Sequence, residues 1–115
     1  MSSPTQRSIQ WLKERGYTCC IAEHYNAFAH VRKDLFGWID IVALHPDKKG
    51  VLGIQCTTGS NISARITKAE ALKSYGLWIA CGNTALFMGW RKLKTGKVQR
   101  TWHPHITEVS LENLL

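Results

Sequence analysis

Residues 36–57 read FGWIDIVALHPDKKGVLGIQCT, two mainly apolar runs joined by a polar turn, and a carboxylate, Asp40, and an amide, Gln55, stand in these runs. A carboxylate inside an apolar strand costs free energy unless it is paired or binds a cation. Carboxylate and amide oxygens are hard ligands of the kind that Mg²⁺ takes. With a second carboxylate from Glu23, we expect Glu23, Asp40 and Gln55 to hold a metal ion that generates hydroxide from bound water.

The two apolar runs, residues 38–44 and 51–57, are predicted to be β-strands that pair through the turn at residues 45–50. Asp40 lies five residues before the first residue of that turn, and Gln55 lies five residues after its last residue. The two side chains should therefore lie opposite each other. Both runs are almost continuously apolar, which favours central positions in a sheet that is covered on both faces.

Thr57 shares a strand face with Gln55, because side chains alternate along a strand. Its hydroxyl can hydrogen-bond a water but carries no charge. A predicted helix at residues 61–75 can supply positive charge, since Arg65 and Lys68 follow Asn61 at helical spacing. They are candidates to reach the site or to contact a phosphate; the alternative is that both are ordinary solvated residues. The predicted nucleic-acid contacts are Arg32, Lys33, Asn61, Arg65 and Lys68.

The composition is that of one globular domain, residues 1–115, with a net charge of +7. This charge favours a polyanionic partner such as DNA, although many basic proteins bind no nucleic acid. The four cysteines form no Cys-x-x-Cys pair, so we expect reduced, buried thiols and no structural zinc site. No apolar run has the length of a membrane span, and the first ten residues lack the apolar core of a signal peptide. We expect a cytoplasmic protein of a bacterial or phage-infected cell.

The predicted elements form a mixed α/β sheet flanked by helices, with a β-hairpin at the C-terminus. The first helix begins with a capping box, Ser3 to Gln6, and ends near Gly16. Residues 26–36 are expected to be a loop or a short extended piece. Asp34 could cap a turn or assist the site, and we favour the turn. The remaining expected elements are strands at 17–25, 38–44 and 51–57, a helix at 61–75, strands at 77–81 and 84–91, a turn at 94–97, a strand at 98–102 and a short edge element at 106–111.

The motif Phe36-Gly37-Trp38-Ile39-Asp40-Ile41-Val42-Ala43, followed by Ile54-Gln55-Cys56-Thr57, resembles the PD-(D/E)xK nuclease superfamily. The resemblance is to small phage-type members of the Holliday-junction-resolvase-like and VRR-NUC-like kinds, and it extends over most of the chain. It implies a restriction-endonuclease-like αβββαβ core, the element order expected above. It also implies a Mg²⁺-dependent endodeoxyribonuclease, with Mn²⁺ as a possible substitute, and a possible homodimer.

The resemblance assigns roles to individual residues. Asp40 matches the metal-binding aspartate, and Gln55 matches the position of the second acidic ligand. Thr57 departs from the pattern, because it stands where the family has its lysine. Arg65 or Lys68 would then replace that charge. The predicted catalytic residues are Asp40, Gln55, Thr57, Lys68 and Arg65.

The departure at Thr57 leaves two other hypotheses open. The chain can be a catalytically degenerate nuclease fold that binds DNA or a protein without cutting, or a subunit that dimerises through its C-terminal hairpin. Tryptophans could stack on bases, and for Trp38 and Trp78 we expect core packing instead.

Overall fold

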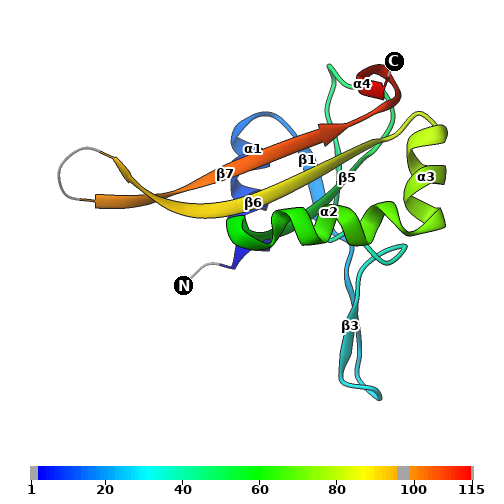
Figure 1. Cartoon of the computed structure of the whole chain (residues 1–115), viewed down its shortest axis with the longest axis horizontal. Coiled ribbons are helices and arrows are strands. Elements are labelled where there is room, and N and C mark those ends of the chain that lie inside the picture. The colour runs from blue at the N-terminus through cyan, green and yellow to red at the C-terminus, as the bar shows by residue number, and fades with distance from the viewer. Residues whose placement is uncertain (1–2, 96–98, 115) are drawn as a thin grey trace.

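A computed structural model describes residues 3–95 and 99–114 of the chain (Figure 1). The helices are α1 (Pro4–Glu14), the short 3-10 turn η1 (Gly59–Asn61), α2 (Ile62–Glu70), α3 (Lys73–Ala80) and α4 (Leu111–Leu114). The strands are β1 (Thr18–Ile21), β2 (His24–Asn26), β3 (Val31–Lys33), β4 (Ile41–Leu44), β5 (Leu52–Thr58), β6 (Thr84–Thr95) and β7 (Gln99–Val109). No helix among the described residues is long and apolar enough to span a bilayer.

Five strands form one mixed sheet in the order β1-β4-β5-β6-β7, and β2 pairs with β3 in a separate hairpin. The pair β5–β6 is parallel, and the other neighbours are antiparallel. Leaving the β2–β3 hairpin aside, α1, β1, β4, β5, α2 and β6 follow the predicted α-β-β-β-α-β order. The prediction of a mixed α/β sheet flanked by helices is confirmed.

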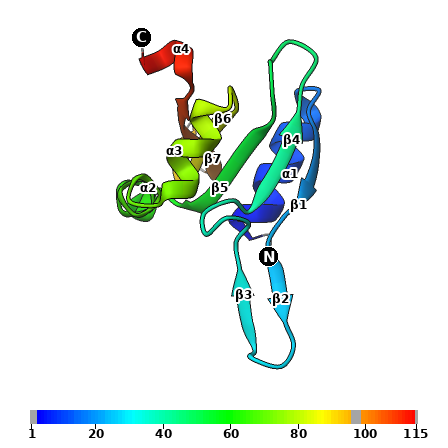
Figure 2. The ribbon, with the colours of Figure 1, turned by 90° about the vertical axis from the view of Figure 1, so that its right-hand side faces the viewer.

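Each face of the sheet carries its own apolar core. Helix α1 covers one face, where Leu12 packs with Ile41, Ile54 and Met88. Helices α2 and α3 cover the other face (Figure 2). The apolar residues buried on that side are Trp38, Ile39, Ile62, Ala69, Ile79, Ala85 and Phe87. Strands β4 and β5 therefore occupy the central, doubly covered positions that their apolar sequences predict.

The predicted strand at residues 77–81 is wrong, because this segment belongs to helix α3. A short apolar run fits a buried strand or a helix equally well. Here Tyr75, Trp78 and Ile79 are spaced for one helical face. All three belong to the core between the helices α2 and α3 and the sheet. The predicted helix 61–75 is in fact two helices, since α2 ends at Glu70 and α3 begins at Lys73. The last strand of the α-β-β-β-α-β order is therefore β6, and not the predicted strand at 77–81.

The segment between β1 and β4 also differs from prediction. The expected strand 17–25 ends at Ile21. Residues 26–36, expected to be a loop or a short extended piece, contain the short strand β3, which pairs with β2. Strand β4 begins at Ile41 rather than at residue 38. The expected edge element at 106–111 is divided between β7 and α4. The expected turn at 94–97 lies partly outside the described residues.

Helix α1 has the predicted capping box, in which the backbone N–H of Gln6 donates to Ser3 Oγ and the Gln6 side chain accepts from the Ser3 N–H. One turn later, the buried Ser8 Oγ donates to the carbonyl of Pro4 over 2.8 Å. Trp90 Nε1 on β6 donates to the same Ser8 Oγ, also over 2.8 Å. This hydroxyl thus ties α1 to the sheet through a buried polar contact.

Replacing Ser8 by alanine should destabilise the protein by about 1–3 kcal/mol, because the buried indole N–H of Trp90 loses its acceptor. Urea unfolding followed by circular dichroism measures the change. Ser63→Ala is the matched control, since this serine is exposed on α2. Equal stability of the two variants would contradict the importance of the Ser8 contact.

Candidate metal centre

Asp40 lies immediately before β4, and the neighbouring strands fix its backbone on both sides. Its carbonyl accepts the N–H of Ala22 over 2.7 Å, and its own N–H donates to the carbonyl of Ile54 over 2.8 Å. Its carboxylate Oδ2 accepts the backbone N–H of Cys56 over 2.9 Å. Only 7% of the residue is exposed. The carboxylate is therefore buried and held against the centre of the sheet.

A closed loop brings Asp34 to Asp40. Leu35 and Ile39 form an antiparallel bridge and exchange both backbone hydrogen bonds, of 2.9 and 3.0 Å. Asp34 precedes this bridge and Asp40 follows it, so the next pair in the same register joins the two aspartates. Phe36 and Gly37 adopt φ values of 55° and 87° between them, which allows the loop to close in so few residues.

The β2–β3 hairpin brings Glu23 to Asp34 in the same way. His24 pairs with Lys33 at the base of the hairpin. Glu23 and Asp34 are the residues just outside this pair, so they face each other where the two strands leave the body of the protein. Asp34 thus stands directly between two backbone pairings, the hairpin pair His24–Lys33 and the bridge Leu35–Ile39.

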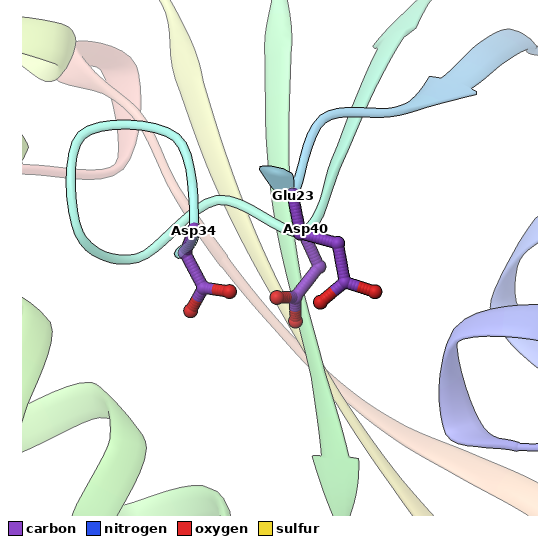
Figure 3. A group of neighbouring side chains, drawn as sticks. All are labelled: Glu23, Asp34 and Asp40. Atoms are coloured by element: carbon purple, nitrogen blue, oxygen red, sulfur yellow. The ribbon is translucent and has the colours of Figure 1, made fainter. Parts of the chain in front are cut away.

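The three carboxylates form one acidic group, which we define as Glu23, Asp34 and Asp40 (Figure 3). One oxygen from each lies within 4.8 Å of the others. Figure 3 shows the three side chains pointing to the same side of the chain. Oxygens bound to one Mg²⁺ at 2.0–2.1 Å lie about 3–4 Å apart, so small side-chain rotations suffice to bring this set onto a cation. The group can hold a metal ion.

The electrostatics of the acidic group also favour a cation. The pKa of Asp40 is raised from 3.8 to about 8, first by burial and then by a hydrogen bond with the Asp34 carboxyl group. The charges of Asp34 and Glu23 raise it further, and the Cys56 N–H opposes the shift. A bound cation would replace the proton that Asp40 otherwise keeps.

The predicted register of the strands around Asp40 and Gln55 is confirmed. The predicted set of carboxylates was incomplete, because it lacked Asp34. Ile41 pairs with Ile54, so Asp40 and Gln55 are the next opposed pair in the predicted register. Asp34, for which a turn role was favoured, does start a turn, because Gly37 N–H donates to its carbonyl over 3.0 Å. Its side chain nevertheless belongs to the acidic group. No periodic pattern in the sequence points to this role, because the loop that brings Asp34 to Asp40 closes through the positive φ values of Phe36 and Gly37.

Gln55 lies beside the acidic group and is 4% exposed. Its amide Nε2 donates to Asp34 Oδ2 over 3.4 Å, so the amide nitrogen faces the carboxylates in this orientation. Turning the amide by 180° would present its oxygen to a cation instead. Thr57 follows on the same face of β5 and is 6% exposed. The metal role of Gln55 and the catalytic role of Thr57 stay predictions.

The candidate cations of helix α2 are Arg65 and Lys68. Arg65 is half-buried and Lys68 is exposed. Within the described part of the chain, neither forms a hydrogen bond or ion pair with Glu23, Asp34 or Asp40. Asn61, the last residue of η1, and Lys33 are both exposed, and Arg32 lies on β3. Their predicted contacts with nucleic acid stay predictions.

Two other sequence predictions concern the aromatic and thiol groups. Trp38 is 1% exposed and Trp78 packs at the edge of the same core, as expected. Trp90 is also buried, at 5% exposed, so it cannot stack on a base. All four cysteines are free, but Cys20 and Cys81 are exposed and Cys19 and Cys56 are half-buried, so the prediction that all are buried is wrong. Burial raises the pKa of the Cys56 thiol to about 12, which excludes it as a nucleophile near neutral pH.

No protein-family model matches the sequence, and neither the curated proteins nor the solved structures contain a significant match. The geometry of the acidic group is therefore the basis for proposing a function.

Asp40→Asn should stabilise the metal-free protein at about pH 8 and have little effect at about pH 5. The folded pKa of Asp40 lies above its unfolded value, so the folded chain holds a proton that the unfolded chain has released between 3.8 and about 8. Wild-type stability must then fall as pH rises through this window. Asparagine keeps an acceptor for the Cys56 N–H but has no charge to bury.

Thermal unfolding in EDTA across this pH range measures the difference, which should reach several degrees at the alkaline end. Asp47→Asn is the matched control, because the Asp47 side chain is 88% exposed in the 45–50 turn. A melting-temperature difference between Asp40→Asn and wild type that does not change with pH would contradict the raised pKa.

Metal binding should compete with the proton on Asp40. Below about pH 8, the affinity for Mn²⁺ should rise about tenfold per pH unit, because ligands must lose their protons before they bind. Above that pH the affinity should level off. Isothermal titration calorimetry of wild type, Asp40→Asn and Asp47→Asn measures this, and only Asp40→Asn should lose the binding. Absence of binding to the wild type would exclude a metal centre here.

Proposed function

We propose that the protein is a Mg²⁺-dependent nuclease that hydrolyses phosphodiester bonds of DNA. The observation that carries the proposal is the acidic group, in which three carboxylates meet at the end of the central strands and one of them keeps a raised pKa. The net charge of +7 adds support, because a basic chain attracts the DNA backbone. The resemblance of the motif around Asp40 and Gln55 to PD-(D/E)xK nucleases points the same way.

The residues of the chain would divide the work between binding and positioning. Asp40, fixed by the Cys56 N–H, would supply the most rigid ligand, while Glu23 and Asp34 complete the shell. A Mg²⁺ bound there would lower the pKa of a bound water and stabilise charge on the phosphoryl group. Gln55 would orient this water or bind the metal through its oxygen. In this proposal the acidic group positions the cation, and exposed basic residues position the phosphate.

Thr57 favours a second candidate function, a DNA-binding module that has lost its cleavage activity. The side chain is buried in β5 and cannot supply the charge of the family's lysine. Arg65 and Lys68 remain the candidates to replace it, but both would have to move toward the acidic group. A protein of this kind would bind DNA with steep salt dependence and would leave the phosphodiester bonds intact.

A cleavage assay distinguishes the two functions. The wild-type protein is incubated with labelled linear, branched and single-stranded DNA in Mg²⁺ or Mn²⁺, with EDTA as the blank. Asp40→Asn should lower the rate at least about 100-fold through loss of a metal ligand, whereas Asp47→Asn should cut like wild type. Because Asp40→Asn is also expected to be the more stable protein, its loss of activity would not be a folding defect.

Two outcomes would count against the nuclease proposal. Equal cutting by wild type and Asp40→Asn would point to a contaminating activity. Tight, salt-sensitive DNA binding by the wild type without any metal-dependent cutting would instead support the binding module.

A further inference from the structure

The β2–β3 hairpin projects from the body of the protein as a narrow arm. Both ribbon views show it extending away from the five-stranded sheet and from the helices (Figures 1 and 2). The arm comprises residues 24–33, and its two ends join Glu23 and Asp34 of the acidic group. A two-stranded hairpin is only marginally stable in water by itself. Its projection thus has no evident role in holding the core together.

The tip of the arm carries an aromatic ring in full contact with solvent. Phe28 is 100% exposed, and Tyr25 and Val31 on the two strands are 52% and 44% exposed. Single exposed apolar residues are common, but a fully exposed phenylalanine at the end of a projecting hairpin is unusual because burial of such a ring contributes about 1.5–3 kcal/mol. The arm presents this ring instead of burying it.

The conformation of the tip is held by a local contact. His30 has φ of 54°, a conformation that costs free energy for a residue other than glycine. Tyr25 Oη lies 3.2 Å from His30 Nδ1 and forms a hydrogen bond that ties this residue to the strand. A strained residue with its ring held in place keeps the turn in one shape. The turn therefore presents Phe28 in a defined position.

The charge of the arm fits a nucleic acid better than a protein. Residues 24–33 read HYNAFAHVRK and contain two basic residues, two histidines and no acidic residue. Lys33 is exposed at its base, next to Asp34. Phe28 follows Glu23 by five residues, which span at most about 17 Å in an extended strand. That distance corresponds to at most about five nucleotide steps of 3.4 Å.

We propose that this arm binds DNA by stacking Phe28 on an unpaired base up to about five nucleotides from the phosphate at the acidic group. The proposal rests on the proposed function, because it takes the acidic group as the place of the scissile phosphate. It names the substrate class as DNA that carries an unpaired or readily unstacked base, such as a bulge, a branch point or a single strand. Aromatic rings stack on every base, and apolar wedges enter base steps that are easily opened.

The test measures binding in EDTA, where metal-dependent cleavage cannot occur. Fluorescein-labelled duplexes, one fully paired and one with a single unpaired adenine, are titrated with the full-length protein. Phe28→Ala should weaken binding to the bulged duplex about 5- to 100-fold, the range that loss of one base-stacking contact gives. Phe28→Trp should restore it. Leu77→Ala is the matched control, because Leu77 is 55% exposed on α3.

The outcomes separate the arm from the nuclease. A selective loss for the bulged duplex in Phe28→Ala, with Leu77→Ala unchanged, supports the arm even if the wild type cuts no DNA, which would overturn only the nuclease. If Phe28→Ala binds the bulged duplex as tightly as wild type does, the proposed role of the arm is overturned. The nuclease proposal is not affected by that result. Equal weakening on both duplexes overturns the unpaired-base specificity. If Phe28→Ala sediments as a monomer where the wild type is a dimer, and DNA binding is unaltered, the tip contacts a second copy of the chain. The proposed stacking on DNA is then overturned. Failure of the wild type to bind either duplex in EDTA overturns the arm, and the cleavage assay then decides the nuclease separately.

Discussion

Asp34 is the residue on which the candidate site depends, because two separate backbone pairings end at it. The hairpin register places Glu23 opposite Asp34, and the closed loop between Leu35 and Ile39 places Asp40 next to it. Like charges directly opposite each other destabilise a pairing. The backbone hydrogen bonds of both pairings therefore oppose the repulsion that they create. A compact group of carboxylates in such a place is stable only while protons or a cation neutralise part of its charge.

The position of the group in the sheet explains how the fold tolerates it. Asp40 stands at the start of β4, between β1 and β5, and backbone hydrogen bonds from both neighbours fix it. Only 7% of Asp40 is exposed, so the carboxylate has little room to turn toward water. The N–H of Cys56 is the only direct donor that the structure gives it among the described residues. Asp40 is thus held rigidly, while its negative charge is only partly compensated. This is the arrangement expected where a bound ligand completes the charge balance.

The register of Asp40 and Gln55 could be predicted from sequence because it follows from a period of two and the length of one turn. The presence of Asp34 could not, since no periodic pattern describes the positive φ values of Phe36 and Gly37 that close its loop. The predicted strand at residues 77–81 was wrong for another reason. An apolar run of that length satisfies a strand and a helix equally, and only packing of Trp78 and Ile79 against the sheet decides between them.

The arm and the acidic group are directly connected, since Glu23 and Asp34 flank the last hairpin pair, His24 and Lys33. Any ligand that orders the arm also fixes the separation of two of the three carboxylates. By linkage, a cation that fixes the carboxylates must order the base of the arm to the same extent in free energy. If DNA contacts the tip at Phe28, binding of the substrate and assembly of the metal centre are therefore coupled. Such coupling would let the protein complete its metal shell on DNA of suitable shape, without a separate domain movement.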